Sequence, residues 1–495
     1  MSLTDVRPAS SGPARATLWH PTGRTKIVAT IGPATNSASA IRALREAGLG
    51  VARLNLSHGD LDWHADAIRL LREVVPDVPI LLDIPGRKIR TIQLKHEPTF
   101  LKGDELILTT DTTHDGTRKV PVNYSHLHAD LSVGNVILAD DGTLRFTVLS
   151  IDGVDIRCRA ETSGQLKSTK GINVPYVKLG TRLLTDRDRK IVAFACEQGA
   201  DYIGISFVES AKHVEAIRGL IQGPAPRIVS KIENQGGLDN MHEVIAASDA
   251  IMIDRGDLSV ETNLENLAVM QKQIIEAARA NAKPVIVATE MLHTMIDNSF
   301  PTKAEVTDIA NAVFDGCAAT MLSGETAVGL NPNDAVEIMS RVIESAEKHE
   351  HRAESERSDD VSIPEVIAEA IATMCRQLPI TKIVTVTLGG FSARMISARR
   401  PSQPILAVTN DASAARAFNL FQGTRGVVVD VPFSRESTDH IAQCLEELWH
   451  RGEIENEDMI LVTSVGYPNS GNRMNMIETH EVSDLAKALA WRPRD

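Results

Sequence analysis

The stretch RIVSKIENQGG, residues 227–237, begins as an apolar run and becomes ionic at Lys231 and Glu233. The run is typical of a buried strand, in which side chains two positions apart point to the same side. We therefore expect Lys231 and Glu233 to project together from one strand end. Most isolated pairs of this kind are exposed ion pairs that contribute little to stability. The rest of the chain decides whether this pair differs.

Seven further short apolar runs surround this stretch, at residues 25–32, 51–58, 79–84, 202–207, 250–257, 284–290 and 318–325. Helical patterns lie between most of them; SASAIRALREAG (37–48), for example, has apolar residues three and four positions apart. Strands that alternate with helices predict a parallel sheet, and eight such units close a (β/α)8 TIM barrel. Nearly every run ends in polar or charged residues, and the carboxyl ends of the strands carry the chemistry in such barrels.

The barrel is predicted at residues 21–91 and 184–350, with a different segment inserted at 92–183. The insert has alternating runs joined by Asp-Gly turns, which predicts antiparallel strands. We expect it to be a small β-barrel lid domain that closes over the active end of the TIM barrel. A charged linker begins near residue 349, and residues 351–495 predict a C-terminal α/β regulatory domain. Residues 1–20 are expected to form a flexible tail.

The composition of the chain limits the classes of partner that it is expected to bind. The chain has 495 residues, of which 43% are hydrophobic and 24% charged, as in soluble globular proteins. Its net charge of -13 argues against nucleic acid or an anionic membrane as partner. The five cysteines are scattered without a C-x-x-C pair, which suits a reducing compartment. No signal peptide or membrane-spanning run is found, so we expect a cytoplasmic protein.

The strand ends would present a set of polar side chains to one barrel mouth. The cations are Arg53, Lys88, Arg90 and Lys231, the carboxylates Asp83, Glu233, Asp257 and Glu325, and the neutral groups Asn55, Ser57, Ser206, Thr289 and Ser323. Oxygen ligands without thiolates or paired histidines suit Mg²⁺ or Mn²⁺. Fixed cations beside a metal held by carboxylates suit phosphoryl transfer, in which negative charge spreads over the transferred group. The chain lacks the P-loop and protein-kinase motifs.

The motifs TKIVATIGPATNS, ARLNLSHG, KSTKGINVP, KIEN, RGDLSVE, ATEML and LSGETAVG together resemble those of the pyruvate kinase family, in the same order. The C-terminal segments SARMISARRPSQPILAVT and EDMILVTSVGYPNSGNRMNM are similar to the last domain of that family. The resemblance covers nearly the whole chain. It implies transfer of a phosphoryl group from phosphoenolpyruvate to ADP, which gives pyruvate and ATP, in a homotetramer.

The resemblance also implies roles for residues that match the motifs. Lys231 would neutralise the phosphoryl group, and Glu233 and Asp257 would bind the catalytic Mg²⁺. Arg53 would hold the substrate phosphate, with Ser206 and Ser323 nearby, and the backbone of Gly256 and Asp257 would receive the substrate carboxylate. Thr289 would belong to the proton relay that converts enolpyruvate to pyruvate. The nucleotide would meet His58, Asn55, Arg90 and, from the lid, Lys170.

The third-strand motif departs from the family pattern. Here it reads DIPGRKIR, so that Lys88 stands where a glutamate is common. Relatives with the glutamate need K⁺, at a site that matches Asn55, Ser57, Asp83 and the backbone of Ile84. We predict that Lys88 acts as a tethered cation and that K⁺ is not required. The alternative is that Lys88 points to solvent.

Milder departures are Glu209, Asp254, Ser259, Glu290 and His293. Strand alternation predicts that Asp254 and Gly256 share one side of the strand, with Arg255 and Asp257 on the other. Asp254 and Glu290 would then add carboxylates near the barrel or at a subunit contact.

Two other functions stay open at this point. A metal-dependent barrel lyase or aldolase acting on pyruvate-like enolates would use the same carboxylates but has no evident need of Lys231 or the lid. A non-catalytic sensor would bind metabolites through the C-terminal domain, where the loops LGGFSAR (388–394) and TSVGYPNSGN (463–472) could hold a phosphorylated effector. The sequence does not name that effector.

Overall fold

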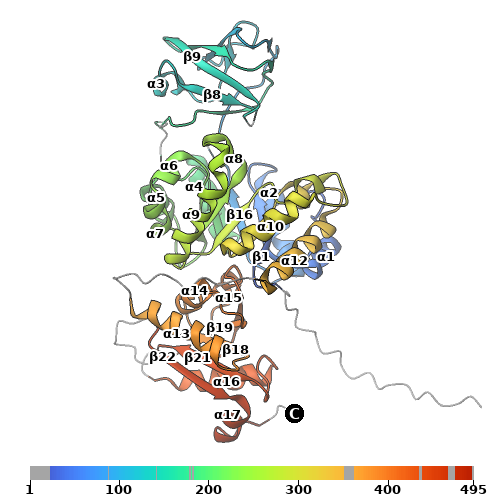
Figure 1. The fold of residues 1–495 in the computed structure, drawn as a ribbon, viewed down its shortest axis with the longest axis vertical. Coiled ribbons are helices and arrows are strands. Elements are labelled where there is room, and N and C mark those ends of the chain that lie inside the picture. The colour runs from blue at the N-terminus through green and yellow to red at the C-terminus, as the bar shows by residue number, and fades with distance from the viewer. Residues whose placement is uncertain are drawn as a thin grey trace, which may run out of the picture.

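The computed structural model describes residues 23–86, 88–140, 142–177, 180, 183–349, 362–433, 437–465 and 474–492. Three bodies follow one another along its long axis, with a β lid at one end, a barrel in the middle and an α/β domain at the other end (Figure 1). The predicted tail at 1–20, most of the charged linker and most of the loop 463–472 lie outside the described residues.

The middle body is a closed barrel of eight parallel strands in the order β1-β17-β16-β15-β14-β13-β3-β2. The strands are β1 Lys26–Thr30, β2 Leu49–Asn55, β3 Ile80–Ile84, β13 Tyr202–Ile205, β14 Arg227–Ile232, β15 Ala250–Asp254, β16 Val285–Ala288 and β17 Ala319–Leu322. Seven of them lie within the predicted apolar runs, and β2 begins two residues before the run at 51–58, so the TIM-barrel prediction is confirmed. In this architecture all carboxyl ends of the strands open to one mouth.

Helices cover the outside of the barrel. They are α1 Ala38–Ala47, α2 Leu61–Val74, α4 Asp186–Glu197, α5 Ala211–Arg218, α6 Gln235–Asp239, α7 Met241–Ala247, α8 Arg255–Glu261, α9 Leu267–Ala280, α10 Lys303–Asp315, α11 Gly324–Ala327 and α12 Pro332–Lys348, with 3₁₀ turns η1 Leu264–Asn266 and η2 His293–Ile296. Their ends follow the sequence. Ser37 caps α1 by accepting from the backbone N–H of Ala40, and α1 ends at Gly48, whose φ of 129° favours glycine.

The lid is a β-barrel built on a seven-stranded sheet in the order β4-β12-β8-β9-β10-β6-β7. Its elements are β4 Ile89–Arg90, β5 Thr99–Phe100, β6 Glu105–Thr109, β7 Val120–Pro121, α3 Leu127–Asp130, β8 Val136–Ala139, β9 Leu144–Asp152, β10 Asp155–Ala160, β11 Gly164–Gln165 and β12 Gly171–Asn173, with β5 and β11 paired separately. A bridge between Thr91 and Val122 joins the two edges of the sheet. The first lid strand therefore starts directly after Lys88.

The C-terminal domain has a five-stranded sheet in the order β20-β19-β18-β21-β22, parallel except for β22. Its elements are α13 Ile363–Gln377, β18 Lys382–Val386, α14 Phe391–Ala398, β19 Ile405–Thr409, α15 Ala412–Phe418, β20 Thr424–Val428, α16 Asp439–His450, β21 Met459–Ser464, β22 Met476–Glu481 and α17 Val482–Ala488. None of the described helices is both long and apolar enough to span a bilayer.

This domain closes the amino-terminal end of the barrel. The hydroxyl of Tyr202, at the start of β13, donates to the carbonyl of Ala417 at 2.6 Å. The ammonium of Lys26, at the start of β1, donates to the carbonyl of Thr424 at 2.9 Å. Phe418 and Phe421 belong to the same apolar cluster as the residues that fill the barrel interior. The opposite mouth is thus the open one, and it faces the lid (Figure 1).

Candidate active site

Lys231 lies at the carboxyl end of β14 and is only 5% exposed. Its ammonium lies 3.0 Å from Oε2 of Glu233, 3.1 Å from Oδ2 of Asp254 and 3.8 Å from Oδ2 of Asp83. It also donates to Oγ of Ser206 at 3.2 Å. Lys231 and Glu233 do share one side, as predicted. A lysine buried among three carboxylates is not the common exposed ion pair, because burying charges is costly unless they are paired.

The charges of this group depend on one another. Burial lowers the pKa of Lys231, but Asp83, Glu233 and Asp254 together raise it well above its ordinary value, so the side chain stays an ammonium. Burial raises the pKa of Glu233 by more than Lys231 lowers it. The pKa of Asp254 is lowered, because Lys231 and the hydrogen bonds to the carboxylate outweigh burial.

Glu233 directly follows β14 and is fully buried. Its Oε1 accepts the backbone N–H of Phe207 at 2.6 Å, and its Oε2 lies 3.0 Å from the ammonium of Lys231. Glu233, Asp254 and Asp257 each offer an oxygen, and these oxygens lie within 4.8 Å of one another. Carboxylate oxygens about 2 Å from a common centre can fall within this separation, so the three residues fit a divalent ion.

The expected separation of Asp254 from Asp257 is wrong. Strand β15 ends at Asp254, and helix α8 begins at Arg255. The two-residue alternation of a strand therefore no longer applies beyond Asp254, and a helical turn brings residues three apart to the same side. As a result Asp254 and Asp257 face one centre.

Lys88 does not point to solvent. Its ammonium donates to Oδ1 of Asp257 at 2.6 Å, and its side chain is 18% exposed. Lys88 also passes close to the lid, because a side chain added at Gly171 of β12 would come within 2.7 Å of its Cε. The lysine thus reaches one of the three carboxylates that could hold a divalent ion. Nearby in the mouth, Oδ1 of Asp83 is buried and accepts no hydrogen bond from the described residues.

Arg53 lies at the end of β2 and is held rigidly. It donates to Oδ2 of Asp83 from Nη2 at 2.6 Å and from Nε at 3.1 Å, and to Oγ1 of Thr30 at 2.9 Å. Among the described residues of this group, three cations (Arg53, Lys88 and Lys231) face four carboxylates (Asp83, Glu233, Asp254 and Asp257). The formal charge is therefore one negative unit, and a divalent ion would change it to one positive unit, which favours an anionic substrate.

Thr289 follows β16 in a strained conformation. Its φ is 67°, which is rare for a β-branched residue, and such strain is found at functional sites where the surroundings hold it. Arg255 fixes this conformation by donating a hydrogen bond to the carbonyl of Thr289 at 2.7 Å. The Thr289 hydroxyl accepts the N–H of Gly256 at 2.8 Å. It can donate its one proton to the carbonyl of Ala288 at 2.6 Å or to Oδ1 of Asp254 at 3.2 Å.

The serines predicted for the site lie around the same mouth. Ser206 accepts from Lys231 and donates to the carbonyl of Ile84 at 2.9 Å. Oγ of Ser323 is buried and has no hydrogen-bond partner among the described residues. Glu325 was expected to present its carboxylate to the mouth, but it instead accepts the backbone N–H groups of Leu292 and Ser323. Its role in this structure is to fix the loop after β17.

The residues predicted for the nucleotide are more exposed. Oδ1 of Asn55 accepts the backbone N–H of Ser57 at 3.1 Å, and His58 lies exposed beside them. Arg90 donates to the carbonyl of Thr169 at 3.0 Å, and Lys170 pairs with Asp140 at 2.6 Å. These contacts hold Arg90 and Lys170 on the lid, whereas Asn55, Ser57 and His58 lie on the barrel.

Sequence reasoning did not assign a role to Asp254 or Phe207. Asp254 ends an apolar run just as Lys231 does, so its position was a signal, but its partner Lys231 lies on another strand. Phe207 supports Glu233 through a backbone N–H, which carries no sequence signal.

Comparison with known proteins agrees with this geometry. Residues 22–336 match the family model described as pyruvate kinase, barrel domain, and residues 365–480 match that described as pyruvate kinase, alpha/beta domain. The pyruvate kinase of Bacillus licheniformis is 38% identical over 478 residues, which cover 93% of this chain and 81% of the relative. That of Geobacillus stearothermophilus is 36% identical over 476 residues, with the same coverage.

A solved structure is also similar. A crystal structure described as a pyruvate kinase from Cryptosporidium parvum superposes with a TM-score of 0.84 at 34% sequence identity. The match covers 93% of this chain and 96% of that one, so it includes all three bodies.

Proposed function

The chain belongs to the pyruvate kinase family and is a phosphotransferase, and from this premise we propose that its reaction depends on Mg²⁺ or Mn²⁺ but not on K⁺. The P–O bond to the enol oxygen of phosphoenolpyruvate breaks, and a bond to the terminal phosphate oxygen of ADP forms. The enolate then takes a proton at its methylene carbon and becomes pyruvate. The observation that carries the proposal is the burial of Lys231 beside Glu233 and Asp254, two carboxylates that form one group with Asp257.

Glu233 and Asp257 would hold the divalent ion, and Asp254 lies close enough to be a third ligand. The fit rests on carboxylate oxygens that lie within 4.8 Å of one another, one of them from the fully buried Glu233. When bound, the ion supplies positive charge to the transferred phosphoryl group and to the substrate. The amide of Phe207 keeps Glu233 turned toward this position.

The chain's own cations bind the substrate phosphate. Arg53 is fixed by Asp83 and Thr30, so its guanidinium needs little reorganisation when an anion arrives. Lys231 would contact the phosphoryl group in flight, and its carboxylate neighbours keep it protonated for that task. Ser206 and Ser323 would donate to substrate oxygens. The first turn of α8, at Gly256 and Asp257, would receive the substrate carboxylate.

Thr289 would hold and move the proton. Its hydroxyl lies within reach of both Gly256 N–H and Oδ1 of Asp254, so it can pass a proton while remaining hydrogen-bonded. Arg255 fixes the backbone carbonyl of Thr289, which keeps the hydroxyl in register with the start of α8. A positioned group of this kind commonly contributes about 10²- to 10⁴-fold in rate.

ADP would bind between the barrel and the lid. His58 and Asn55 lie on the barrel side, and Arg90 and Lys170 on the lid side. Arg90 lies on β4 and Lys170 directly precedes β12, two strands that pair with each other. Closure of the lid would therefore bring both cations to the nucleotide phosphates together.

Lys88 would replace K⁺. The monovalent-cation site of relatives matches Asn55, Ser57, Asp83 and the backbone of Ile84, and Oδ1 of Asp83 is buried there without a hydrogen bond from the described residues. In the ion-free arrangement the Lys88 ammonium rests on Asp257. We propose that it leaves Asp257 when the divalent ion binds and moves toward Asp83, so that no K⁺ is needed.

Three further features belong to the proposal. None of the five cysteines, each within the described ranges, forms a disulfide, which suits a reducing cytoplasm. Family resemblance alone supports a homotetramer. The loop 388–394 supports a phosphorylated effector only through its place in the family's C-terminal domain.

A coupled assay for ATP, with phosphoenolpyruvate, ADP and Mg²⁺, tests the function. We expect turnover with the wild-type chain and a loss of several orders of magnitude in Lys231→Met. The matched control is Lys303→Met, since Lys303 is exposed at the start of α10. A barrel lyase would form no ATP, and a sensor would keep its function after Lys231→Met; either result would contradict the proposal.

A further inference from the structure

A cavity of about 560 Å³ lies next to the active site, between the barrel and the lid. We call it the hinge cavity, because Pro85, Gly86 and Lys88, which connect β3 to β4, line one side of it. Its other walls come from β13, α5, α6 and the end of α8 on the barrel, and from β12 and residues 174–177 on the lid. Its volume falls within the range usual for small-molecule sites.

The walls of the hinge cavity combine an apolar body with hydrogen-bond acceptors. Ile172 and Val177 from the lid face Ile205 and Ile217 from the barrel. The lining carboxylates are Asp188, Glu209, Asp239 and Glu261, and the lining bases among the described residues are Lys88 and His213. Lys88 is itself paired with Asp257. Within the described part of the wall the four carboxylates outnumber the two bases, which favours a positively charged occupant.

Asn173 is a second and independent sign of a ligand. It is only 3% exposed and lines the hinge cavity. Its amide Nδ2 donates to Oε1 of Glu261 at 2.7 Å, which fixes the orientation of the side chain. Its Oδ1 is then left as a buried acceptor without a hydrogen bond from any residue that the structure describes. A buried acceptor of this kind is costly unless a donor reaches it.

We propose that the hinge cavity binds a compact organic cation, a primary amine carried on an apolar body, and that this occupant regulates phosphoryl transfer. The ammonium donates to Oδ1 of Asn173 and to the carboxylates of Glu261 and Glu209, while the apolar body lies against Ile217 and Val177. Binding is argued from the cavity alone. The regulatory half rests on the proposed function.

Three residues of the cavity wall also contact the catalytic group. Ser206 accepts from Lys231, the N–H of Phe207 donates to Glu233, and Lys88 donates to Asp257. Phe207 has a φ of 52°, and its ring packs on Gly86, since a Cβ there would lie 2.4 Å from the ring. An occupant that shifts the backbone of Phe207 would therefore shift the donor that orients Glu233.

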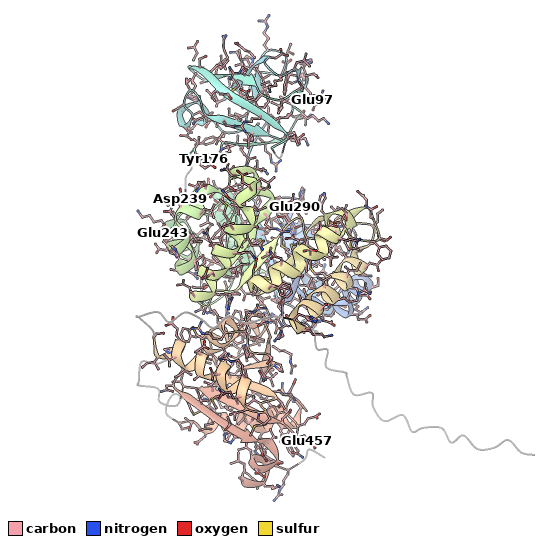
Figure 2. All side chains as sticks on the ribbon, viewed as in Figure 1. Glu97, Tyr176, Asp239, Glu243, Glu290 and Glu457 are labelled. Atoms are coloured by element: carbon pink, nitrogen blue, oxygen red, sulfur yellow. The ribbon has the colours of Figure 1, made fainter. Side chains whose placement is uncertain are left out.

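The occupant also joins the lid to the barrel. Figure 2 shows Tyr176 at the junction of the two bodies and Asp239 on the barrel below it, and both line the cavity. Tyr176 reaches the barrel directly, because its hydroxyl donates to Oδ1 of Asn263 at 3.4 Å. A ligand held by Asn173 on one side and Glu209 on the other fixes the angle between lid and barrel. We expect it to lower turnover, because the lid has to move in each cycle.

Three probes of equal shape test the binding: cyclohexylmethylamine, cyclohexanemethanol and cyclohexanecarboxylate. Binding to the full chain without substrates is measured by calorimetry and ligand-observed NMR. We expect the amine to bind, the alcohol to bind at least about tenfold more weakly, and the acid not to bind, since charge-assisted hydrogen bonds are stronger than neutral ones. Equal affinity of amine and alcohol, or no binding of the amine at millimolar concentration, overturns the proposal.

Variants locate the site. Glu261→Gln and Glu209→Gln should each weaken the binding of the amine about tenfold. Val177→Trp should prevent binding by filling the cavity. Glu215→Gln is the matched control, because Glu215 is exposed on α5 and does not line the cavity. Circular dichroism confirms folding of each variant. If Glu215→Gln lowers the affinity as much as Glu261→Gln does, the site is not the hinge cavity.

The same experiment separates this inference from the proposed function. The amine should bind Lys231→Met as tightly as wild type, so a failure of catalysis leaves the binding result intact. In an active wild-type chain, saturating amine should lower the turnover number several-fold without raising the Michaelis constant for phosphoenolpyruvate. Unchanged turnover at saturation would refute the regulatory half, and displacement of the amine by phosphoenolpyruvate would refute a separate site.

Discussion

The ammonium of Lys88 donates a 2.6 Å hydrogen bond to Oδ1 of Asp257. A lysine at the base of the lid therefore holds one of the three carboxylates that could bind a divalent ion. Lys88 directly precedes the first lid strand, and Asp257 lies in the first turn of α8 on the barrel. The charge balance of the active site is thereby linked to the segment on which the lid turns. A divalent ion at Asp257 would compete with this lysine for the carboxylate, so metal binding and lid position are expected to influence each other.

Lys88→Glu should create a requirement for K⁺. The substitution changes the local charge by two units, and a monovalent cation would then restore the balance near Asp83. We expect wild-type turnover to change less than a few-fold when K⁺ is replaced by tetramethylammonium. In Lys88→Glu, K⁺ should activate about tenfold or more, which corresponds to about 1.4 kcal/mol. Lys88→Gln is the control with intermediate charge. Strong K⁺ activation of the wild type would contradict the prediction.

Asp254→Asn should weaken the binding of Mn²⁺. The amide keeps the shape of the side chain but removes one negative charge from the centre shared with Glu233 and Asp257. We expect the dissociation constant to rise about tenfold, measured by the paramagnetic resonance signal of free Mn²⁺. Asp297→Asn, at an exposed position, should leave it unchanged. Equal affinities in wild type and Asp254→Asn would show that Asp254 is not a ligand and acts through Lys231 and Thr289.

Thr289→Val should separate proton transfer from phosphoryl transfer. The variant keeps the branched shape but removes the hydroxyl between Gly256 and Asp254. Exchange of the methyl hydrogens of pyruvate in deuterated water, followed by NMR, should slow about 100-fold. Thr289→Ser should retain most of the exchange. If both variants exchange at the wild-type rate, the proton passes through another group.

The buried ammonium of Lys26 should make the stability of the protein depend on pH. Burial lowers its pKa from 10.5 to about 8, against the attraction of Glu347. Between pH 8 and 10.5 the unfolded chain binds this proton and the folded chain does not, so the free energy of unfolding rises with pH. The gain approaches about 3 kcal/mol at high pH and is absent below about pH 8. Lys26→Met should remove this part of the slope in urea titrations at several pH values. Parallel slopes for both proteins would contradict the assignment.

The barrel was predictable from the sequence because its signals are local. Each strand is a short apolar segment, and most of the runs end in a polar group that reaches the mouth. Lys231 and Glu233 sit two apart on one strand, so period-two geometry alone brings them to one side. The lid was visible for a similar reason, since its alternating strands and Asp-Gly turns differ from the runs around them.

The missing parts of the site depend on contacts between distant segments or on a change of geometry within one segment. Asp254 was assigned to the wrong side because nothing in IDRGDLS marks where the strand becomes helix α8. The partner of Lys88 could not be predicted, because Asp257 lies far along the chain, in the first turn of helix α8. Glu325 resembled the other carboxylates at strand ends, but its backbone partners depend on how the loop after β17 folds.

The closure of the amino-terminal end of the barrel by the C-terminal domain has a consequence for folding during synthesis. Phe418 and Phe421 complete the same apolar interior as Val28, Tyr202 and Met252, although a ribosome releases all eight strands before it reaches them. A nascent chain that stops at residue 349 should therefore hold a complete but unsealed barrel. We expect such a fragment to bind a dye for exposed apolar surface and to require a chaperone, whereas a full-length chain should do neither. Synthesis of the last domain would then be the step that finishes the catalytic one.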